Sequence, residues 1–442
     1  MAASPAPSWR DAIRGNVLAV GLVSLLSDFA SEMVNPILPL FLAGVVGAGA
    51  APLLLGVIEG LADTTASLLK IISGRVSDRI GRRKPLVVVG YVLANAARPL
   101  IGLCTTGGQV VALKVVDRIG KGLRTSPRDA LIGDAAPPAL RGLAFSFHRA
   151  MDHSGAVIGP LCAALLLFLL LGRLVWRGAE GELGPSELDA LRTVFLISAV
   201  PGALAVLAAI FGVRELPPTR PLASPRADAP AGEADAPAGE ADAPAGANPR
   251  PPRRAPLPRR FYAFVGVATV FALGNSSDLF LVLYAHERHG LGLGGVIGLW
   301  VVLHVAKILA SLPGGVASDR LGRRPVLIAG WILYAAVYLG FALAPGPGAL
   351  IALLVLYGVY YGLTEGAAKA LVADLVESER RATAFGVYHG AIGLAALPAS
   401  LLFGALWSAF GPIVALGVGS GLAFAASLGL LVLVRPAPGE QG

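Results

Sequence analysis

Long apolar segments alternate with short polar segments along nearly the whole chain. Stretches long enough to cross a bilayer, which takes about 20 mainly apolar residues, recur at 17–45, 52–73, 85–106, 109–132, 142–172 and 190–213, and again at 261–285, 293–315, 325–345, 348–373, 382–410 and 411–434. The first and the eleventh are longer than a bilayer requires, and Pro36 and Pro39 can open or kink the first. The pattern predicts an all-α integral membrane protein with twelve transmembrane helices, six on each side of a central break.

The central break has a composition of its own. The heptad ADAPAGE at 227–233 recurs at 234–240, and a Pro- and Arg-rich run follows. So few large apolar side chains cannot offset the entropy cost of ordering the segment. We therefore expect an N-terminal six-helix bundle at 1–213, a disordered cytoplasmic linker at 214–260 and a C-terminal six-helix bundle at 261–442.

Composition excludes the soluble classes. Of the 442 residues, 14% are charged, against about 25% in an ordinary soluble domain. A disulfide-built secreted protein is excluded as well, because Cys104 and Cys162 are the only cysteines and both lie in apolar stretches.

The net charge of +8 would suggest a nucleic-acid partner in a soluble protein. Here the Lys and Arg residues collect in alternate loops, such as 75–84 and 320–324, whereas 46–51 and 105–108 carry no charge. Basic loops mark the cytoplasmic side. We expect no nucleic-acid partner, both termini in the cytoplasm, and a multi-pass location in a bacterial inner (plasma) membrane.

The two halves of the chain repeat each other. GRVSDRIGRRKP at 74–85 matches GVASDRLGRRP at 315–325, where Asp78 and Asp319 are offset by 241. ALIGDAAPPALRGLAF at 130–145 matches ALVADLVESERRATAF at 370–385, an offset of 240. Two six-helix repeats in the same orientation predict a pseudo-two-fold axis along the membrane normal, with a site between the halves at mid-depth.

The duplicated loop pattern G-x-x-x-D-R-x-G-R-R resembles the signature of the major facilitator superfamily of secondary transporters. The resemblance implies that family's fold, transport by alternating access, and a role of these loops in holding the cytoplasmic side in one state. For the arginines, a purely topogenic role is the alternative. The implied gating residues are Gly74, Asp78, Arg79, Gly81 and Arg82 in the first copy and Gly315, Asp319, Arg320, Gly322 and Arg323 in the second.

A second motif lies in the fifth span. Gly155, Gly159 and Pro160 in GAVIGPLCAA are similar to the antiporter motif of drug/proton exporters, with Ala163-Ala164 where that motif usually has glycines. The similarity implies export by antiport. The alternative is close helix packing through small residues.

Carboxylates inside predicted spans are candidates for proton coupling. Asp28 and Glu32 are four residues apart, as are Glu59 and Asp63, so each pair shares a helical face. Two such pairs facing each other would repel when ionised, which favours uptake of a proton. Asp152 in the fifth-span segment HRAMDH joins this set. The alternative for each carboxylate is a structural ion pair.

Basic residues form a stripe on one face of the fourth span: Lys114, Arg118, Lys121, Arg124 and Arg128. The stripe can pair with the carboxylates of the first two spans or bind an anionic substrate. Glu365 and Lys369, four residues apart, are expected to neutralise each other. The predicted substrate-cavity residues are Arg98, Lys114, Arg118, Lys121, Asp278, Lys307, Glu365 and His389.

These features predict proton-coupled secondary transport of a small molecule, with efflux by antiport as the leading hypothesis. A proton-linked transporter of a polar anionic metabolite, by uptake or symport, is the alternative, and a non-transporting membrane sensor is a remote one. The sequence contains no metal-ligand spacing, phosphate-binding loop or nucleophile constellation, so we expect neither an enzyme nor a metal or cofactor site. The expected partners are a substrate, protons and lipid, and the expected state is a monomer.

Overall fold

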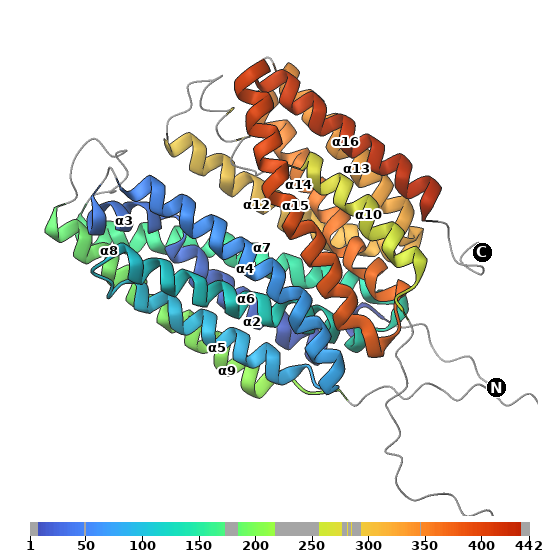
Figure 1. Ribbon diagram of the computed structural model, residues 1–442, viewed down its shortest axis with the longest axis horizontal. Helices are drawn as coiled ribbons and strands as arrows, with labels where there is room; N and C mark the ends of the chain where they lie inside the picture. Colours follow the sequence, from blue (N-terminus) through green and yellow to red (C-terminus); the bar gives the residue numbers. More distant parts are fainter. Residues whose placement is uncertain are drawn as a thin grey trace, which may run out of the picture.

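The computed structural model describes residues 8–47, 50–172, 184–216, 256–275, 281, 284, 293–344 and 346–434. Within these residues the regular structure is helical, and the helices follow the predicted spans closely (Figure 1). Asp278 and most of the predicted linker (217–255) lie outside the described residues. The domain boundaries at 213 and 260 therefore stay a prediction.

The first six spans correspond to helices between residues 16 and 212. The short α1 (Trp9–Ala12) precedes them, and a break at 35–37 divides the first span, because Pro36 has no N–H to continue a helix. The helices are α2 (Asn16–Val34), α3 (Leu38–Val46), α4 (Ala51–Ile80), α5 (Lys84–Ile101), α6 (Gly107–Ala135), α7 (Arg141–Leu171), α8 (Pro185–Ile197) and α9 (Ala199–Gly212).

The second six spans repeat this order. They are α10 (Arg259–Gly274), α12 (Leu293–Leu321), α13 (Arg323–Leu343), α14 (Pro347–Leu375), α15 (Arg381–Phe410) and α16 (Pro412–Leu433). Short 3-10 turns lead into α7 and α15 at equivalent positions, η1 (Pro138–Leu140) and η2 (Ser378–Arg380). The shared turn supports the internal repeat read from the sequence.

Large apolar side chains are exposed along the outer faces of the helices. Leu204 on α9, Leu309 on α12, Leu401 on α15 and Leu431 on α16 are among them. Such extensive apolar exposure marks a surface that contacts lipid rather than water. Eight of the described helices or consecutive helix pairs are long and apolar enough to cross a membrane, so the chain is a multi-pass membrane protein.

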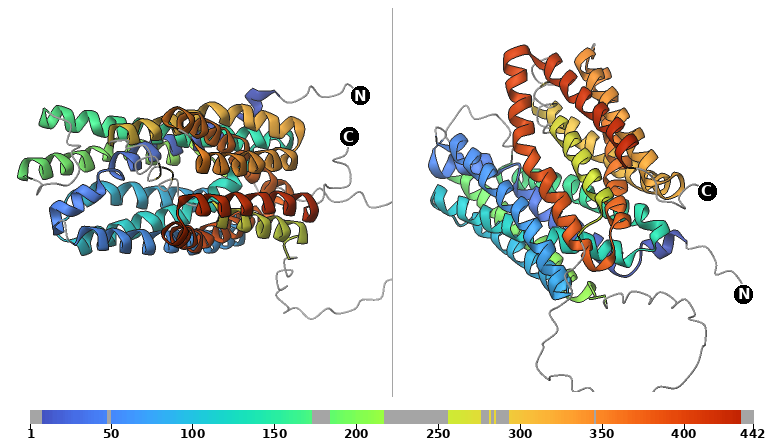
Figure 2. Two further views of the ribbon diagram at one scale, coloured as in Figure 1. Left: turned by 90° about the horizontal axis from the view of Figure 1, so that it is seen from above. Right: turned by 45° about the vertical axis from the view of Figure 1, so that its right-hand side comes forward.

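Two bundles, α2–α9 and α10–α16, converge at one end of the molecule and diverge toward the other (Figures 1 and 2). We name the convergent end, which holds the turns at Gly81 and Gly322, the signature end, and the opposite end the far end. At the convergent end α4 packs against α15 and α7 against α12. Glycines allow these close approaches: Gly74 faces the carbonyl of Ala382, and Gly315 faces that of Gly142.

Candidate transport site and gate

Asp78 connects the two bundles at the signature end. It lies in the last turn of α4 and accepts hydrogen bonds from the backbone N–H groups of Ala382, at 3.3 Å, and Thr383, at 2.6 Å. These groups belong to the first turn of α15, whose unpaired N–H groups and positive dipole end favour a carboxylate. One buried side chain thus ties α4 to a helix of the other bundle.

Asp319 makes the same contact in the opposite direction. This residue of α12 accepts hydrogen bonds from the N–H groups of Gly142, at 2.9 Å, and Leu143, at 2.8 Å, at the start of α7. Arg323 pairs with Asp319 and, at 3.1 Å, with Asp374. Both copies of the signature therefore close onto the opposite bundle, as the pseudo-two-fold axis requires.

Arg83, rather than Arg82, serves the first copy of this gate. Its guanidinium lies 2.9 Å from Asp134 and donates to the carbonyl of Ser378 at 2.6 Å, while Arg381 pairs with the same Asp134. The first turn has one residue more than the second between its glycine and its proline. Arg83 is thereby placed where Arg323 lies in the second copy.

The remaining signature residues act differently. Gly81 and Gly322 have φ of 69° and 93°, a left-handed backbone that favours glycine. The side chains of Arg79, Arg82 and Arg320 are exposed and make no hydrogen bond or ion pair with any described residue. The structure therefore does not bring these three predicted gating arginines to the contact between the bundles.

Glu215, which the sequence reasoning missed, fixes the backbone at the gate. Its carboxylate accepts hydrogen bonds from the N–H groups of Arg83 and Lys84, each at 2.9 Å, at the start of α5. Lys84 in turn donates to the carbonyl of Ile210 at 2.7 Å. The end of the sixth span therefore positions the residue whose guanidinium joins the bundles.

The antiporter-like glycines lie directly against the first carboxylate pair. A Cβ placed on Gly155 would lie 3.0 Å from the Cβ of Asp28, and one on Gly159 would lie 2.8 Å from the Cβ of Glu32. Pro160 follows within α7. Small residues at this face let α7 approach α2 at the level of the carboxylates.

The two carboxylates of α2 differ in their partners. Glu32 accepts a hydrogen bond from the side-chain amide nitrogen of Asn35 at 3.0 Å, and the side-chain oxygen Oδ1 of Asn35 accepts one from Lys114 at 3.0 Å. The Asp28 carboxylate makes no hydrogen bond or ion pair with the described residues, and Lys121 and Arg124 are its basic neighbours. Among the described residues, Lys114 of the basic stripe thus reaches Glu32 through the side-chain amide of Asn35.

The second predicted carboxylate pair is on α4. The side chain of Asp63 is 66% exposed and lies 3.9 Å from Arg118. Glu59 belongs to the same helix, but its side chain is outside the described part of the structure. Elsewhere in this bundle Arg98 pairs with Asp117 at 2.9 Å, so Arg98 is held within the N-terminal bundle.

Two lysines near this pair have no close partner in the described part of the chain. The ammonium groups of Lys70 and Lys121 make no hydrogen bond or ion pair with the described residues, and Arg118 is a charged neighbour of both. The Arg118 Nε is buried without an acceptor among the described residues. Arg124 differs, since it donates to Ser27 at 2.9 Å and lies 4.0 Å from the ring centre of Tyr91.

The predicted neutralisation of Glu365 by Lys369 is wrong. Glu365 accepts two hydrogen bonds from Arg149, at 2.5 and 2.8 Å, and one from His153 at 3.0 Å. Lys369 instead pairs with Asp129 at 3.0 Å. A helical i, i+4 pair contributes only about 0.2–0.5 kcal/mol, so these buried and partly bidentate contacts with the other bundle prevail.

The other predicted polar residues divide between the interface and the C-terminal bundle. Asp152 accepts a hydrogen bond at 2.7 Å from Arg149, which also binds Glu365 of the other bundle. His389 lies 2.8 Å from Asp129 of the other bundle. Lys307 lies 3.7 Å from the ring centre of Tyr361.

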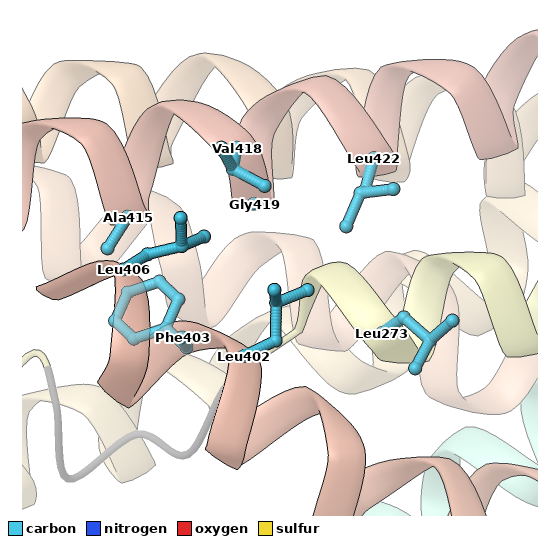
Figure 3. A pocket seen from close by; sticks show the side chains of 8 residues that line it. All are labelled: Leu273, Leu402, Phe403, Leu406, Ala415, Val418, Gly419 and Leu422. Atoms are coloured by element: carbon cyan, nitrogen blue, oxygen red, sulfur yellow. The ribbon is translucent and has the colours of Figure 1, made fainter. Parts of the chain in front are cut away.

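A small apolar pocket lies within the C-terminal bundle between α10, α15 and α16 (Figure 3). Leucines dominate its wall, with Phe403, Ala415, Val418 and Gly419 completing it. Because no polar side chain lines this pocket, it holds none of the charges on which the predicted coupling depends.

Comparison with known proteins agrees with this architecture. The family model described as Major Facilitator Superfamily matches residues 20–306 and 294–442. An uncharacterized MFS-type transporter of Methanocaldococcus jannaschii is 32% identical over 95% of this chain and 94% of its own length. The multidrug resistance protein MdtH of Photorhabdus laumondii is 33% identical over 131 residues, which cover 30% of this chain and 32% of that protein.

Solved structures confirm the fold class. The Escherichia coli fucose:proton symporter FucP aligns with a TM-score of 0.71 and 15% identity, covering 96% of this chain and 100% of that structure. The duplicated signature, the reciprocal contacts of Asp78 and Asp319 and the twelve-helix fold agree with the family match. The chain therefore belongs to the major facilitator superfamily of membrane transporters.

Proposed function

We propose that this transporter exports a small molecule by proton antiport, with Asp28 and Glu32 as its proton-exchanging carboxylates. The observation that carries the proposal is the contact of Gly155 and Gly159 with these two residues. It unites the antiporter-like element and an intramembrane carboxylate pair in one helix contact. The partial similarity to a protein named for multidrug resistance supports the same direction.

We propose further that the signature end faces the cytoplasm of a bacterium and that both termini lie on that side of the plasma membrane. The basic loops at 75–84 and 320–324 support this orientation through the positive-inside rule. In it, residues 214–260 serve as a cytoplasmic spacer between the bundles at 1–213 and 261–442. The far end is then exposed to the outside, and the gate at Asp78 and Asp319 is closed.

In this orientation, Asp28 takes up a proton from the outside after substrate release. Burial and the neighbouring carboxylates of Asp152 and Glu32 oppose a negative charge on Asp28, whereas Arg124 and Lys121 favour its ionised form. Closure of the far end carries the proton inward, and opening of the signature end releases it to the cytoplasm. The carboxylate is then free to favour substrate binding again.

Lys70, Lys121 and Arg118 favour a second candidate function, the proton-linked transport of an anionic metabolite. Donors without a close acceptor among the described residues are the chemistry that a carboxylate or phosphate group satisfies. Because this candidate moves the anion by uptake or symport with a proton, the coupling direction decides between the two candidate functions.

Proteoliposomes with an imposed pH gradient provide the test. Compounds that raise the unfolding temperature of the purified protein are first selected, since a ligand stabilises the state that it binds. Antiport predicts that an acidic vesicle interior drives accumulation of such a compound. Accumulation driven by an acidic exterior instead would overturn the antiport proposal and favour the second candidate.

A further inference from the structure

Asp129 collects basic groups from both bundles inside the interface. Its fully buried carboxylate lies 3.0 Å from the Lys369 ammonium on α14, 2.8 Å from His389 on α15 and 2.9 Å from Arg128 on its own helix. We name Asp129, Lys369 and His389 the central cluster. It forms an ionic contact between the bundles that does not involve the signature loops.

Asp129 and Lys369 are equivalent residues of the two repeats. The offset of 240 that aligns 130–145 with 370–385 also aligns position 129 with 369 and position 149 with 389. Two equivalent side chains that touch lie at the pseudo-two-fold axis. Two carboxylates at these equivalent positions would repel each other, whereas a carboxylate in one repeat and an ammonium group in the other attract each other.

A second ionic contact between the bundles lies beside the central cluster. Glu365, one helical turn before Lys369, accepts from Arg149 and His153 of α7. Helix α14 thus contributes a basic residue, Lys369, to a contact with α6 and an acidic residue, Glu365, to a contact with α7. Sliding or rotation of α14 relative to the N-terminal bundle separates both contacts together.

We infer that the central cluster is a second lock, distinct from the signature gate, that holds the two bundles together on the axis until the signature end opens. In alternating access the two bundles rock against each other around the site between them, so Asp129, which lies on α6 five residues before the gate residue Asp134, must release Lys369 and His389 when the signature end opens. An ion left behind in a buried site without its partner is strongly unfavourable. The cluster therefore biases the equilibrium toward the state that is open at the far end.

The inference rests on alternating access but not on proton coupling, and a conformational measurement keeps the two apart. Spin labels at Ile80 and Leu321 report distances across the signature end, and labels at Leu103 and Phe410 report distances across the far end. These four side chains are all more than half exposed, and Cys104 and Cys162 are first replaced by alanine. Distances are measured by double electron–electron resonance in nanodiscs, without substrate or pH gradient.

Asp129→Asn and Lys369→Met should each increase the population with a long signature-end distance, by about tenfold or more. Each variant is also combined with Asp78→Asn, which weakens the signature gate. This combination makes the shift measurable where the signature gate alone keeps the signature end closed. Asp117→Asn is the matched control, because it breaks a buried ion pair within one bundle. It should leave both distance distributions as they are.

Exchange of the charges separates the lock from general loss of packing. The triple variant Asp129→Lys, Lys369→Asp and Arg128→Met keeps an opposite pair on the axis and removes the guanidinium that pairs with Asp129. Arg149, the equivalent of His389, is already a charged neighbour of position 369. The triple variant should restore the short signature-end distance lost in either single variant. Unchanged distributions in folded Asp129→Asn and Lys369→Met variants that also carry Asp78→Asn, or no restoration by the exchange, would overturn the inference while leaving the antiport proposal untouched.

Discussion

Asp78 and Asp319 are equivalent residues of the two repeats, and each accepts two backbone hydrogen bonds from the first turn of a helix in the other bundle. The reciprocity explains why the signature occurs twice. The first copy joins α4 to α15, and the second joins α12 to α7. Neither contact holds the other helix pair together, so both copies are needed.

Replacing Asp78 or Asp319 by Asn should loosen the signature end. Hydrogen bonds to charged groups contribute about 1.5–3 kcal/mol each, and an amide keeps only part of that. We expect a roughly tenfold shift toward the opened state for each variant and a larger shift for the double variant. The readout is the labelling rate of a cysteine introduced at the signature end, after Cys104 and Cys162 have been replaced by alanine. Asp189→Asn, at an exposed residue with a surface ion pair, is the control, and equal labelling of all four proteins would contradict the gate.

Arg83 and Arg82 should differ sharply. Arg83→Ala removes the ion pair with Asp134 and the hydrogen bond to Ser378, so it should increase labelling as the Asp78 variant does. Arg82→Ala removes an exposed side chain, and surface changes of this kind are usually within about 0.5 kcal/mol. The two variants compared in one labelling experiment test the register of the turn, which is misassigned if Arg82→Ala has the larger effect.

Gly159→Ala should impair the contact between α7 and α2. The added Cβ would lie 2.8 Å from the Cβ of Glu32 and 2.9 Å from the Met33 backbone, and overpacking typically costs about 1–3 kcal/mol. We expect a lower unfolding temperature and slower transport. Gly60→Ala, where nothing lies within 4 Å, is the matched control and should keep or raise the unfolding temperature; equal behaviour of the two would show that this contact is not tight.

Hydrophobic length predicts the helices well because burial in lipid imposes the same requirement on every span. The structure follows the expected boundaries to within a few residues in most spans, and the break before α3 falls at Pro36. The signature likewise locates Asp78 and Asp319 at the gate, since the motif and its place at a helix end define their surroundings.

The interface partners were less predictable because they depend on contacts between distant segments. The one-residue difference in turn length moves the gating role from Arg82 to Arg83. Helical spacing suggested that Glu365 and Lys369 pair with each other, although each pairs across the interface. The repeat offset of 240 could have identified Asp129 from the sequence, because it aligns this acid with a base, Lys369, at the equivalent position of the second repeat.

The central claim, proton antiport through the α2 carboxylates, is tested most directly by flux through Asp28→Asn in proteoliposomes with an acidic interior. The substituted amide can neither bind nor release a proton, and its size is nearly that of the carboxylate it replaces. The account predicts that the variant loses accumulation driven by the pH gradient but still exchanges labelled for unlabelled substrate across the membrane. Full gradient-driven accumulation both by this variant and by Glu32→Gln would contradict the claim.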